Sequence, residues 1–457
     1  MSREGSGSGH GTVSGKHRGT QRPMTVSTKQ QRIAELAKQQ PEMSFTSLNH
    51  YLDVDWLREA YRRLRKASAP GYDGQTVADY GKDLEANLQS LLDRAKSGTY
   101  FAPPARRVHI PKGRGNETRP IGIPATEDKL LQRAVAMILE PIYEQDFLDC
   151  SYGFRPKRSA HGALSALWNQ CMTEGTQWIL DMDISKFFDT LDKAHLRSFL
   201  QRRVRDGVIT RLIGKWLNAG VLEQEVLCYP ETGTPQGGSI SPLLSNVYLH
   251  YVLDQWFAQE VKPRLRGRAF MSRFADDAVM GFEFKEDAEK VLRVLPKRFG
   301  KYGLTIHPEK TRLVAFGRPR GRQGKKSETF DFLGFTHYWG KSRRGKWVIK
   351  RKTARQRLSR GLKRIAEWCR HNRHRPIAKQ HQELCQKICG HFAYYGITGN
   401  DLWLHKYREG VKRLWQKWLH RRSRSSTDMP WDRLTRLLQR YRLPPVKIVH
   451  SIYAAKL

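Results

Sequence analysis

Paired cysteines, long apolar runs and acidic side chains are all scarce in this sequence. Six cysteines occur in 457 residues and none of them forms a CxxC pair, which argues against a disulfide framework and favours a reducing cytoplasm. No apolar run approaches the roughly 20 residues needed to span a membrane. The first residues also lack the apolar core of a secretory signal. We therefore expect a cytoplasmic protein with no membrane partner.

The shortage of acids is the most informative of these features. Against 82 Lys and Arg stand 44 Asp and Glu, which gives a formal net charge of +38. Such an excess predicts a polyanionic partner, because neutralising phosphates releases counterions from nucleic acid. A ribosomal-type structural protein, or a surface that is basic without a specific partner, remains the alternative. The length is sufficient for two or three domains.

Composition divides the chain into three parts. Residues 1–44 are basic and Gly/Ser-rich towards the N-terminus and predict a disordered leader. Residues 45–340 alternate helical and β-prone segments, which is typical of an α+β domain. Residues 341–457 hold 31 Lys and Arg against 6 Asp and Glu and predict a basic helical domain. Five large apolar residues recur there at helical spacing and are expected to face inward: Trp403, Tyr407, Leu414, Trp415 and Trp418.

Two adjacent acids interrupt the apolar run MSRFADDAVMGF, residues 271–282. Carboxylates are poor strand formers, and an unpaired buried charge is expensive. Asp276 and Asp277 would repel each other by roughly 4 kcal/mol at about 4 Å and an effective dielectric near 20. Either positive charge lies beside them, or the pair occupies an exposed turn.

Two other segments suggest what that positive charge is. In WILDMDISKFFDTLD, alternation places Asp181 and Asp183 on one strand face, with Asp183 at the end of the strand. The Gly-rich turn at Gln236 leads into a probable helix. Carboxylates from two strand ends near such a turn form an oxygen cage for two Mg²⁺ ions, which suits in-line phosphoryl transfer. Taken singly, each signal has a plainer explanation: a solvated Asp-Asp turn, a helix cap at Asp183, or an ordinary loop.

Together and in this order, the segments resemble the reverse transcriptases encoded by bacterial group II introns, also called intron maturases. The resemblance covers roughly residues 45–450 and rests on RRVHIPKGRGNETRPIGIP, CSYGFRPKRSAHGAL, DMDISKFFDTLD, GTPQGGSISPLLSNVYLHYVLD, RFADDAVMGF and FDFLGF. It implies a right-hand polymerase with fingers and palm to about residue 340. The tail, with GHFAYYGITGN, is similar to the α-helical thumb or maturase domain of that family.

The resemblance assigns the acids to a metal site. Asp183, Asp276 and Asp277 match the palm carboxylates, with Asp183 and Asp276 as the principal ligands of two Mg²⁺ ions. The backbone carbonyl of Ile184 would be a further ligand. Phe274 stands where the family usually has tyrosine, so one hydrogen bond of about 1 kcal/mol is lost while the aromatic ring remains.

The resemblance also supplies a nucleotide site. Lys112 and Arg119 match residues of the fingers that hold the incoming triphosphate, and Phe188 matches the gate against the sugar 2′ position. Gln236 resembles the glutamine near the nascent base pair, and Lys310 an acid for the pyrophosphate leaving group. Alternatively, Phe188 belongs to the core, Lys310 is a surface charge, and Lys112 binds template phosphate.

The implied function is an RNA-directed DNA polymerase that synthesises cDNA by two-metal nucleotidyl transfer and binds intron RNA to assist splicing and mobility. Its partners would be intron RNA, an RNA template–primer, target DNA and deoxynucleoside triphosphates, in a bacterial cytoplasm. Two other functions fit the same motifs. One is a splicing-only RNA-binding maturase, and the other is a domesticated reverse transcriptase in defence or repair.

Overall fold

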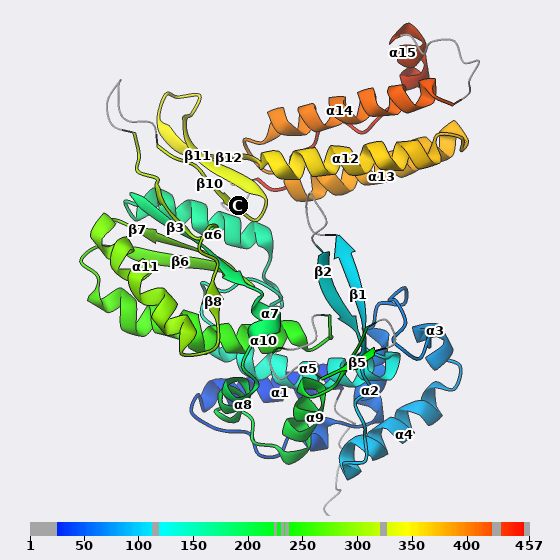
Figure 1. The fold of residues 1–457 in the computed structure, drawn as a ribbon, viewed down its shortest axis with the longest axis vertical. Coiled ribbons are helices and arrows are strands. Elements are labelled where there is room, and N and C mark those ends of the chain that lie inside the picture. The colour runs from blue at the N-terminus through cyan, green and yellow to red at the C-terminus, as the bar shows by residue number, and fades with distance from the viewer. Residues whose placement is uncertain are drawn as a thin grey trace, which may run out of the picture.

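The computed structural model describes residues 25–111, 118–223, 226–229, 233, 237–319, 327–422 and 431–451 (Figure 1). The described chain combines helical regions with three small sheets, so the α+β class predicted from the sequence is confirmed. None of the helices in these ranges has the length and apolarity needed to cross a bilayer.

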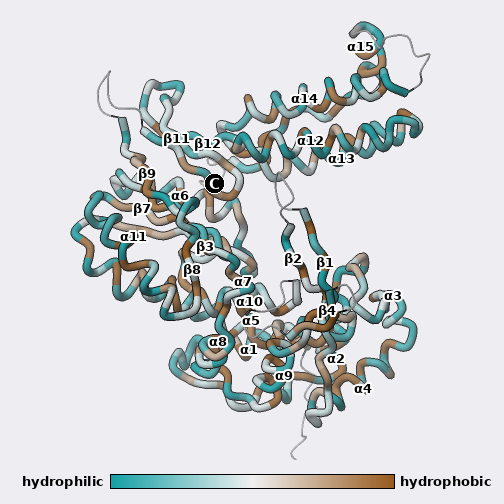
Figure 2. Tube along the Cα trace, in the orientation of Figure 1, coloured by the Kyte–Doolittle hydropathy of each residue, from teal (hydrophilic) through white to brown (hydrophobic). Residues whose placement is uncertain are grey.

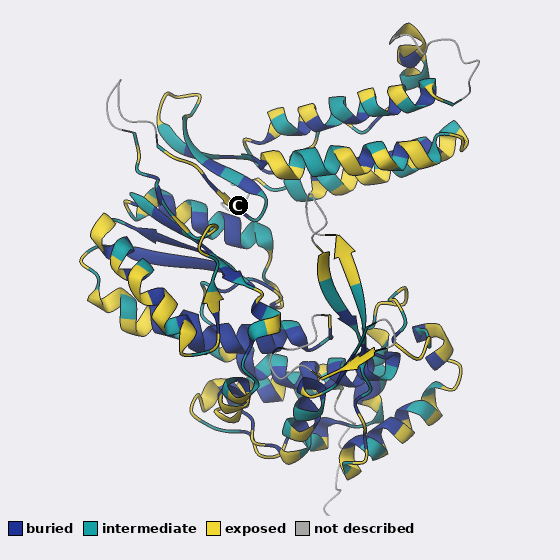
Figure 3. Cartoon of the chain, viewed as in Figure 1, coloured by how far each residue is buried: buried dark blue, intermediate teal, exposed yellow. Residues whose placement is uncertain are grey.

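A central antiparallel sheet has the strand order β6-β7-β3-β8, with β9 also paired to β3. Its strands are β3 (Trp178–Ser185), β6 (Ala269–Phe274), β7 (Asp277–Phe282), β8 (Thr305–Ile306) and β9 (Arg312–Ala315). Figure 3 shows that β6 and β7 are almost wholly buried, whereas buried and half-buried residues are mixed along β3. Figure 2 shows the apolar character of these strands. Helices cover the sheet: α6 (Ala160–Thr173), α7 (Phe187–Thr190), α10 (Ser241–Leu249) and α11 (Lys285–Gly300).

The two faces of the central sheet belong to different cores. Leu180 and Met280 point into the large core that α10 and α11 share with the N-terminal helices. Ile179 and Val279 point the other way, into a second core with α6 and a further sheet. Side chains alternate along a strand, so Asp181 and Asp183 share the face of Ile179.

An N-terminal helical region packs around one long helix, α5 (Thr126–Asp146), most of which is buried. The other helices of this region are α1 (Val26–Gln39), α2 (Val54–Arg62), α3 (Val77–Tyr80), α4 (Leu84–Ser97), α8 (Lys193–Gln201) and α9 (Gly207–Leu217). A hairpin sheet of order β2-β1-β4-β5 rises from them (Figure 1). It contains β1 (Ala105–Pro111), β2 (Thr118–Ile123), β4 (Val221–Glu223) and β5 (Val226–Cys228).

The expectation of a disordered leader through residue 44 is wrong for its second half. Residues 1–24 lie outside the described part of the chain, but α1 begins at Val26 and packs on α5. Ile33 and Ala37 are buried in the large core, and the Gln30 amide donates to the Met137 carbonyl at 2.9 Å. This burial supplies the stabilisation that a short helix lacks by itself.

A connecting sheet leads from the central sheet to the C-terminal helices. Its strands β10 (Phe330–Phe332), β11 (Phe335–Lys341) and β12 (Trp347–Thr353) are antiparallel neighbours in that order. The boundary expected at residues 340 and 341 therefore cuts through β11. The helical part begins only at Arg355. The cations that precede it in β12 lie on a strand and not, as expected, on a helix.

The C-terminal helices are α12 (Arg355–Asn372), α13 (Ile377–Tyr395), α14 (Asp401–His420) and α15 (Trp431–Arg440). They enclose a third core of their own. Tyr407 and Trp415 are buried there as predicted, and Leu414 and Trp418 pack against it half-buried. Trp403 is not part of this core; the ammonium groups of Lys352 and Lys406 lie over its ring instead.

Candidate active site

The hairpin β6–β7 carries two of the predicted acids at its turn. Phe274 and Asp277 are paired across the hairpin, so residues 275 and 276 form a two-residue turn and Asp277 begins β7. Ala275 adopts φ 57°, the positive φ that such hairpin turns require at their first central position. An alanine in this conformation costs on the order of 1–2 kcal/mol, so the surrounding contacts must hold it.

Asp183 lies directly opposite this hairpin. Its Cα is paired with that of Asp277 in the antiparallel β3–β7 ladder, and side chains of paired residues project from the same face. The Asp183 carbonyl accepts from His307 N at 2.8 Å, and its N–H donates to Thr311 Oγ1 at 3.2 Å. Because backbone groups alternate along a strand, the Ile184 carbonyl is directed to the opposite side, towards β7 and its turn.

Negative charge accumulates on this face. Burial raises the pKa of Asp277 to about 7, and repulsion from Asp181, Asp276 and Asp183 adds to the effect. The pKa of Asp181 rises to about 6, again mainly through burial, although Arg312 lies 3.5 Å away and opposes the rise. A face that disfavours its own ionised carboxylates has an electrostatic demand for cations.

The donor set suits a hard divalent cation, because every ligand present is an oxygen atom. Within the described ranges, however, no three His, Cys, Asp or Glu side chains already converge as a metal cluster. The ammonium of Lys310 instead lies 3.1 Å from Asp183 Oδ2. Both side chains are about half exposed, at 51% and 40%, so this ion pair contributes roughly 0–1 kcal/mol and is easily displaced.

The other predicted nucleotide-site residues lie in different elements. Phe188 is half-buried in α7, with its ring centroid 5.2 Å from that of Phe187. Arg119 is exposed on β2, paired with Ile110 of β1. Lys112 and Gln236 fall outside the described residues. Of the three that the structure describes, only Lys310 is in direct contact with a predicted acid.

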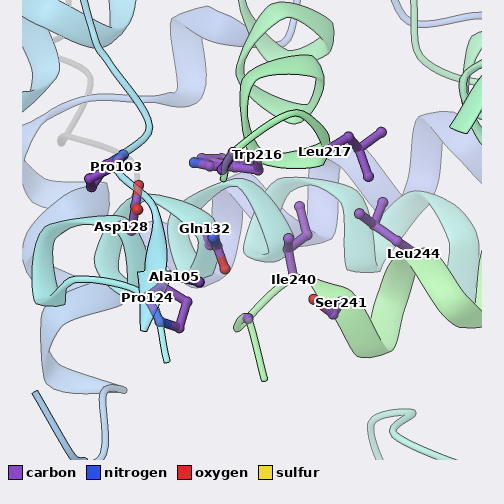
Figure 4. A pocket seen from close by; sticks show the side chains of 12 residues that line it. Pro103, Ala105, Pro124, Asp128, Gln132, Trp216, Leu217, Ile240, Ser241 and Leu244 are labelled. Carbon is purple, nitrogen blue, oxygen red and sulfur yellow. The ribbon is translucent and has the colours of Figure 1, made fainter. Parts of the chain in front are cut away.

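A small pocket lies where α5 and α9 meet the loop before α10 (Figure 4). Its cavity volume is about 30 Å³, enough for a water molecule or two. Burial raises the pKa of Asp128 to about 8, and the buried Gln132 Oε1 has no hydrogen-bond partner among the residues that the structure describes. A Cβ on Gly238 would lie 2.8 Å from that oxygen. The pocket is therefore the place where the turn at Gly237 and Gly238 packs against α5, and its volume is too small for a nucleotide.

The sequence did not lead us to the residues that hold the backbone around the acids in place through hydrogen bonds. Thr311 holds the backbone of Asp183, and it directly follows Lys310, which was noticed. Arg273 and Asp254 form a completely buried ion pair at 2.5 Å. Each of the two interrupts an apolar run, in AFMSRF and in NVYLHYVLDQWF, and an isolated charge in such a run was the available signal.

Comparison with known proteins bears on the family of this chain. Residues 110–337 match the family model described as reverse transcriptase (RNA-dependent DNA polymerase). Protein YkfC of Escherichia coli is 37% identical over 258 residues, which cover 55% of this chain and 66% of YkfC. The group II intron-encoded protein LtrA of Lactococcus lactis subsp. cremoris is 37% identical over 235 residues, 50% of this chain and 38% of LtrA.

A third relative is the mitochondrial nuclear intron maturase 2 of Arabidopsis thaliana, 35% identical over 100 residues, 22% of this chain and 13% of that protein. The matched regions thus span two thirds or less of these relatives. A reverse transcriptase domain implies the fingers and palm of a polymerase and dependence on a divalent metal. The chain belongs to the family of reverse transcriptases and maturases that group II introns encode.

Proposed function

We propose that this protein is an RNA-directed DNA polymerase that also binds intron RNA. The observation that carries the proposal is the shared face of Asp183 and Asp277, with Asp276 in the turn beside them. Burial of this face, with repulsion from the neighbouring acids added to it, raises the pKa of Asp277, and a bound cation would relieve both effects.

Asp183, Asp276, Asp277 and the Ile184 carbonyl would hold two Mg²⁺ ions. When bound, such ions stabilise the attacking and leaving oxygens of an in-line displacement. The protein contributes the rigid β3–β7 ladder and the hairpin turn, which set the spacing of the carboxylates before substrate arrives. That preorganisation lowers the barrier without reorganisation during the reaction.

The remaining candidates act on the nucleotide. Lys310 lies beside Asp183 and would move to protonate the departing pyrophosphate. Lys112 and Arg119, from the β1–β2 region, would bind the triphosphate by charge. Phe188 would exclude a 2′-hydroxyl sterically, which selects deoxynucleotides, and Gln236 would lie near the nascent base pair.

The C-terminal helices would form the thumb and maturase domain. Residues 341–457 carry a net charge of +25, from 31 basic and 6 acidic residues. Cations so concentrated favour phosphate and shape contacts with structured RNA. We therefore propose intron RNA, an RNA template–primer and target DNA as partners, with roles in splicing and intron mobility in a bacterial cytoplasm.

The experiment is primer extension on an RNA template with deoxynucleotides and Mg²⁺, using wild type, Asp276→Ala and the control Asp93→Asn. Asp93 is an exposed acid on α4, away from the central sheet. Asp276→Ala should abolish extension and keep RNA affinity within about twofold of wild type, while Asp93→Asn should leave both extension and RNA affinity at the wild-type level. Extension by Asp276→Ala would refute the site.

Two other outcomes would identify the alternatives. Intron RNA binding and splicing with no extension by wild type, at any salt concentration or temperature, would indicate a splicing-only maturase. Extension by a protein whose gene lies beside no ribozyme core would indicate a domesticated enzyme in defence or repair.

A further inference from the structure

Arg273, in β6, is completely buried and uses every one of its side-chain donors. Nε and Nη2 donate to the two carboxylate oxygens of Asp254 at 2.7 and 2.5 Å. Nη2 also donates to Ser151 Oγ at 2.8 Å, and Nη1 donates to Asn246 Oδ1 at 3.1 Å. Nη1 makes one more bond, at 2.9 Å, to the carbonyl of Ala275.

The side-chain partners of Arg273 come from two separate parts of the chain, the continuous helical run 241–254 and the loop before α6. Asn246 lies on α10, Asp254 ends the π-helical segment His250–Asp254, and Ser151 lies in the loop before α6. All three are buried. The backbone joins the same network, because Arg273 N donates to the Cys150 carbonyl at 2.7 Å and Arg273 O accepts from Tyr152 N at 2.9 Å.

The bond to Ala275 connects this network to the acids. Ala275 is the residue with positive φ in the turn, and Asp276 and Asp277 follow it directly. A buried arginine that lost one partner would keep an uncompensated charge, so each bond resists being broken. Only a planar fork with five donors satisfies these acceptors together, which a lysine cannot do.

We propose that Arg273 is a positioning residue for the reaction: it fixes the carbonyl of Ala275 and thereby holds Asp276 and Asp277 where they receive metal. The inference rests on the proposed function, since it assigns a support to that site. Arg273 touches neither substrate nor metal. Its effect passes through the turn backbone.

The test compares Arg273→Lys with the matched control Arg203→Lys. Arg203 is equally buried, pairs with Asp146 at 3.0 Å and donates to backbone carbonyls near α1, with no contact to the turn. Hydrogen exchange of the amides in residues 274–277 gives a readout that does not depend on activity. The midpoint of Mg²⁺ activation in primer extension gives a second readout.

Arg273→Lys should raise exchange at residues 274–277 about tenfold and raise the activating Mg²⁺ concentration by a similar factor, with RNA affinity unchanged. Arg203→Lys should do neither, even if it lowers the melting temperature equally. Equal exchange in the two variants would overturn the proposal.

Two further outcomes are decisive. Should Arg273→Lys fail to fold, Ser151→Ala removes one acceptor only, and should raise exchange of the same amides about threefold; unchanged exchange there would overturn the proposal. If wild type extends no primer while Arg273→Lys still loosens the turn, the positioning role stands and the proposed polymerase function fails.

Discussion

Replacing Gly153 by alanine should displace the β6–β7 turn, which we propose as part of the metal site, without changing an acid. A Cβ built on Gly153 lies 2.3 Å from Ala275 N, 3.0 Å from Phe274 C and 3.1 Å from Ala275 Cα. All three are backbone atoms, so no side chain can swing aside. Restoring ordinary contact needs a shift of about 1 Å between the loop and the turn, and misplacement of that size costs about 10²-fold in rate. Overpacking of a tight core typically adds a stability loss of about 1–3 kcal/mol.

The assay is single-turnover primer extension together with urea unfolding, with Gly162→Ala as the control. Gly162 lies nine residues away in α6, where a Cβ would meet its nearest atoms at ordinary distances of 3.5 and 3.6 Å. In a helix this substitution should stabilise by up to about 1 kcal/mol. A Gly153→Ala variant that extends primers at more than half the wild-type rate would refute the close approach of loop and turn.

Three further predictions concern single side chains. Phe188→Val should improve ribonucleotide use about tenfold or more relative to deoxynucleotides, measured as the ratio of kcat/KM values. An unchanged ratio would show that Phe188 is a core residue and not a gate against the 2′-hydroxyl. Lys310→Gln should slow nucleotide addition about 10²–10⁴-fold, as measured by rapid-quench kinetics. Because Asp183 is unchanged in this variant, its affinity for template–primer should equal that of wild type. The pKa of Asp128 is raised to about 8 from 3.8, so its protonated form stabilises the fold. Wild type should lose about 1 kcal/mol of unfolding free energy per pH unit as pH rises from about 4 towards about 8. Asp128→Asn should show a flatter dependence in urea titrations, and parallel slopes would contradict the assignment.

The acidic hairpin was predictable because few structures accept two carboxylates inside an apolar run. A turn resolves the conflict in MSRFADDAVMGF, and the β6–β7 hairpin supplies it, although the turn is not exposed: Ala275 is buried and both acids are half-buried. The strand that carries Asp181 and Asp183 on one face followed from simple alternation, but it continues past Asp183 to Ser185, where β8 pairs with it. Pairing of Asp183 with Asp277 did not follow from local pattern, since the two lie 94 positions apart; the resemblance supplied it.

The buried arginine was not predictable in the same way. An Arg inside a strand normally faces solvent, and nothing near Arg273 indicates that its carboxylate partner lies on a helix 19 positions earlier. One apolar run is interrupted by Arg273 and another by Asp254. Only when the two runs are considered together do their opposite charges indicate a buried ion pair. The pairing itself is a tertiary fact.

Composition was a poor guide at both predicted boundaries. The Gly/Ser-rich start drew attention away from the amphipathic segment VSTKQQRIAELAKQ, which forms α1. The preceding residue, Thr25, caps this helix, because its side chain accepts from Thr28 N at 3.2 Å. Near residue 341 the rise in positive charge begins on a strand, because the lysines of β12 alternate with buried Ile349 and Thr353. Charge density changes there before secondary structure does.

The connecting sheet ties the posture of the C-terminal helices to the acidic face. Phe335 and Ile349 share a core with Ile179 and Val279 of the central sheet. At the end of α13 the Tyr394 hydroxyl donates to the Leu333 carbonyl at 2.8 Å, and the Tyr394 carbonyl lies 2.8 Å from His161 Nε2 on α6. Because of this shared core and these two hydrogen bonds, a C-terminal helix displaced by bound RNA would move the sheet that carries the carboxylates. The same contacts therefore couple the position of the C-terminal helices to the position of the acidic face.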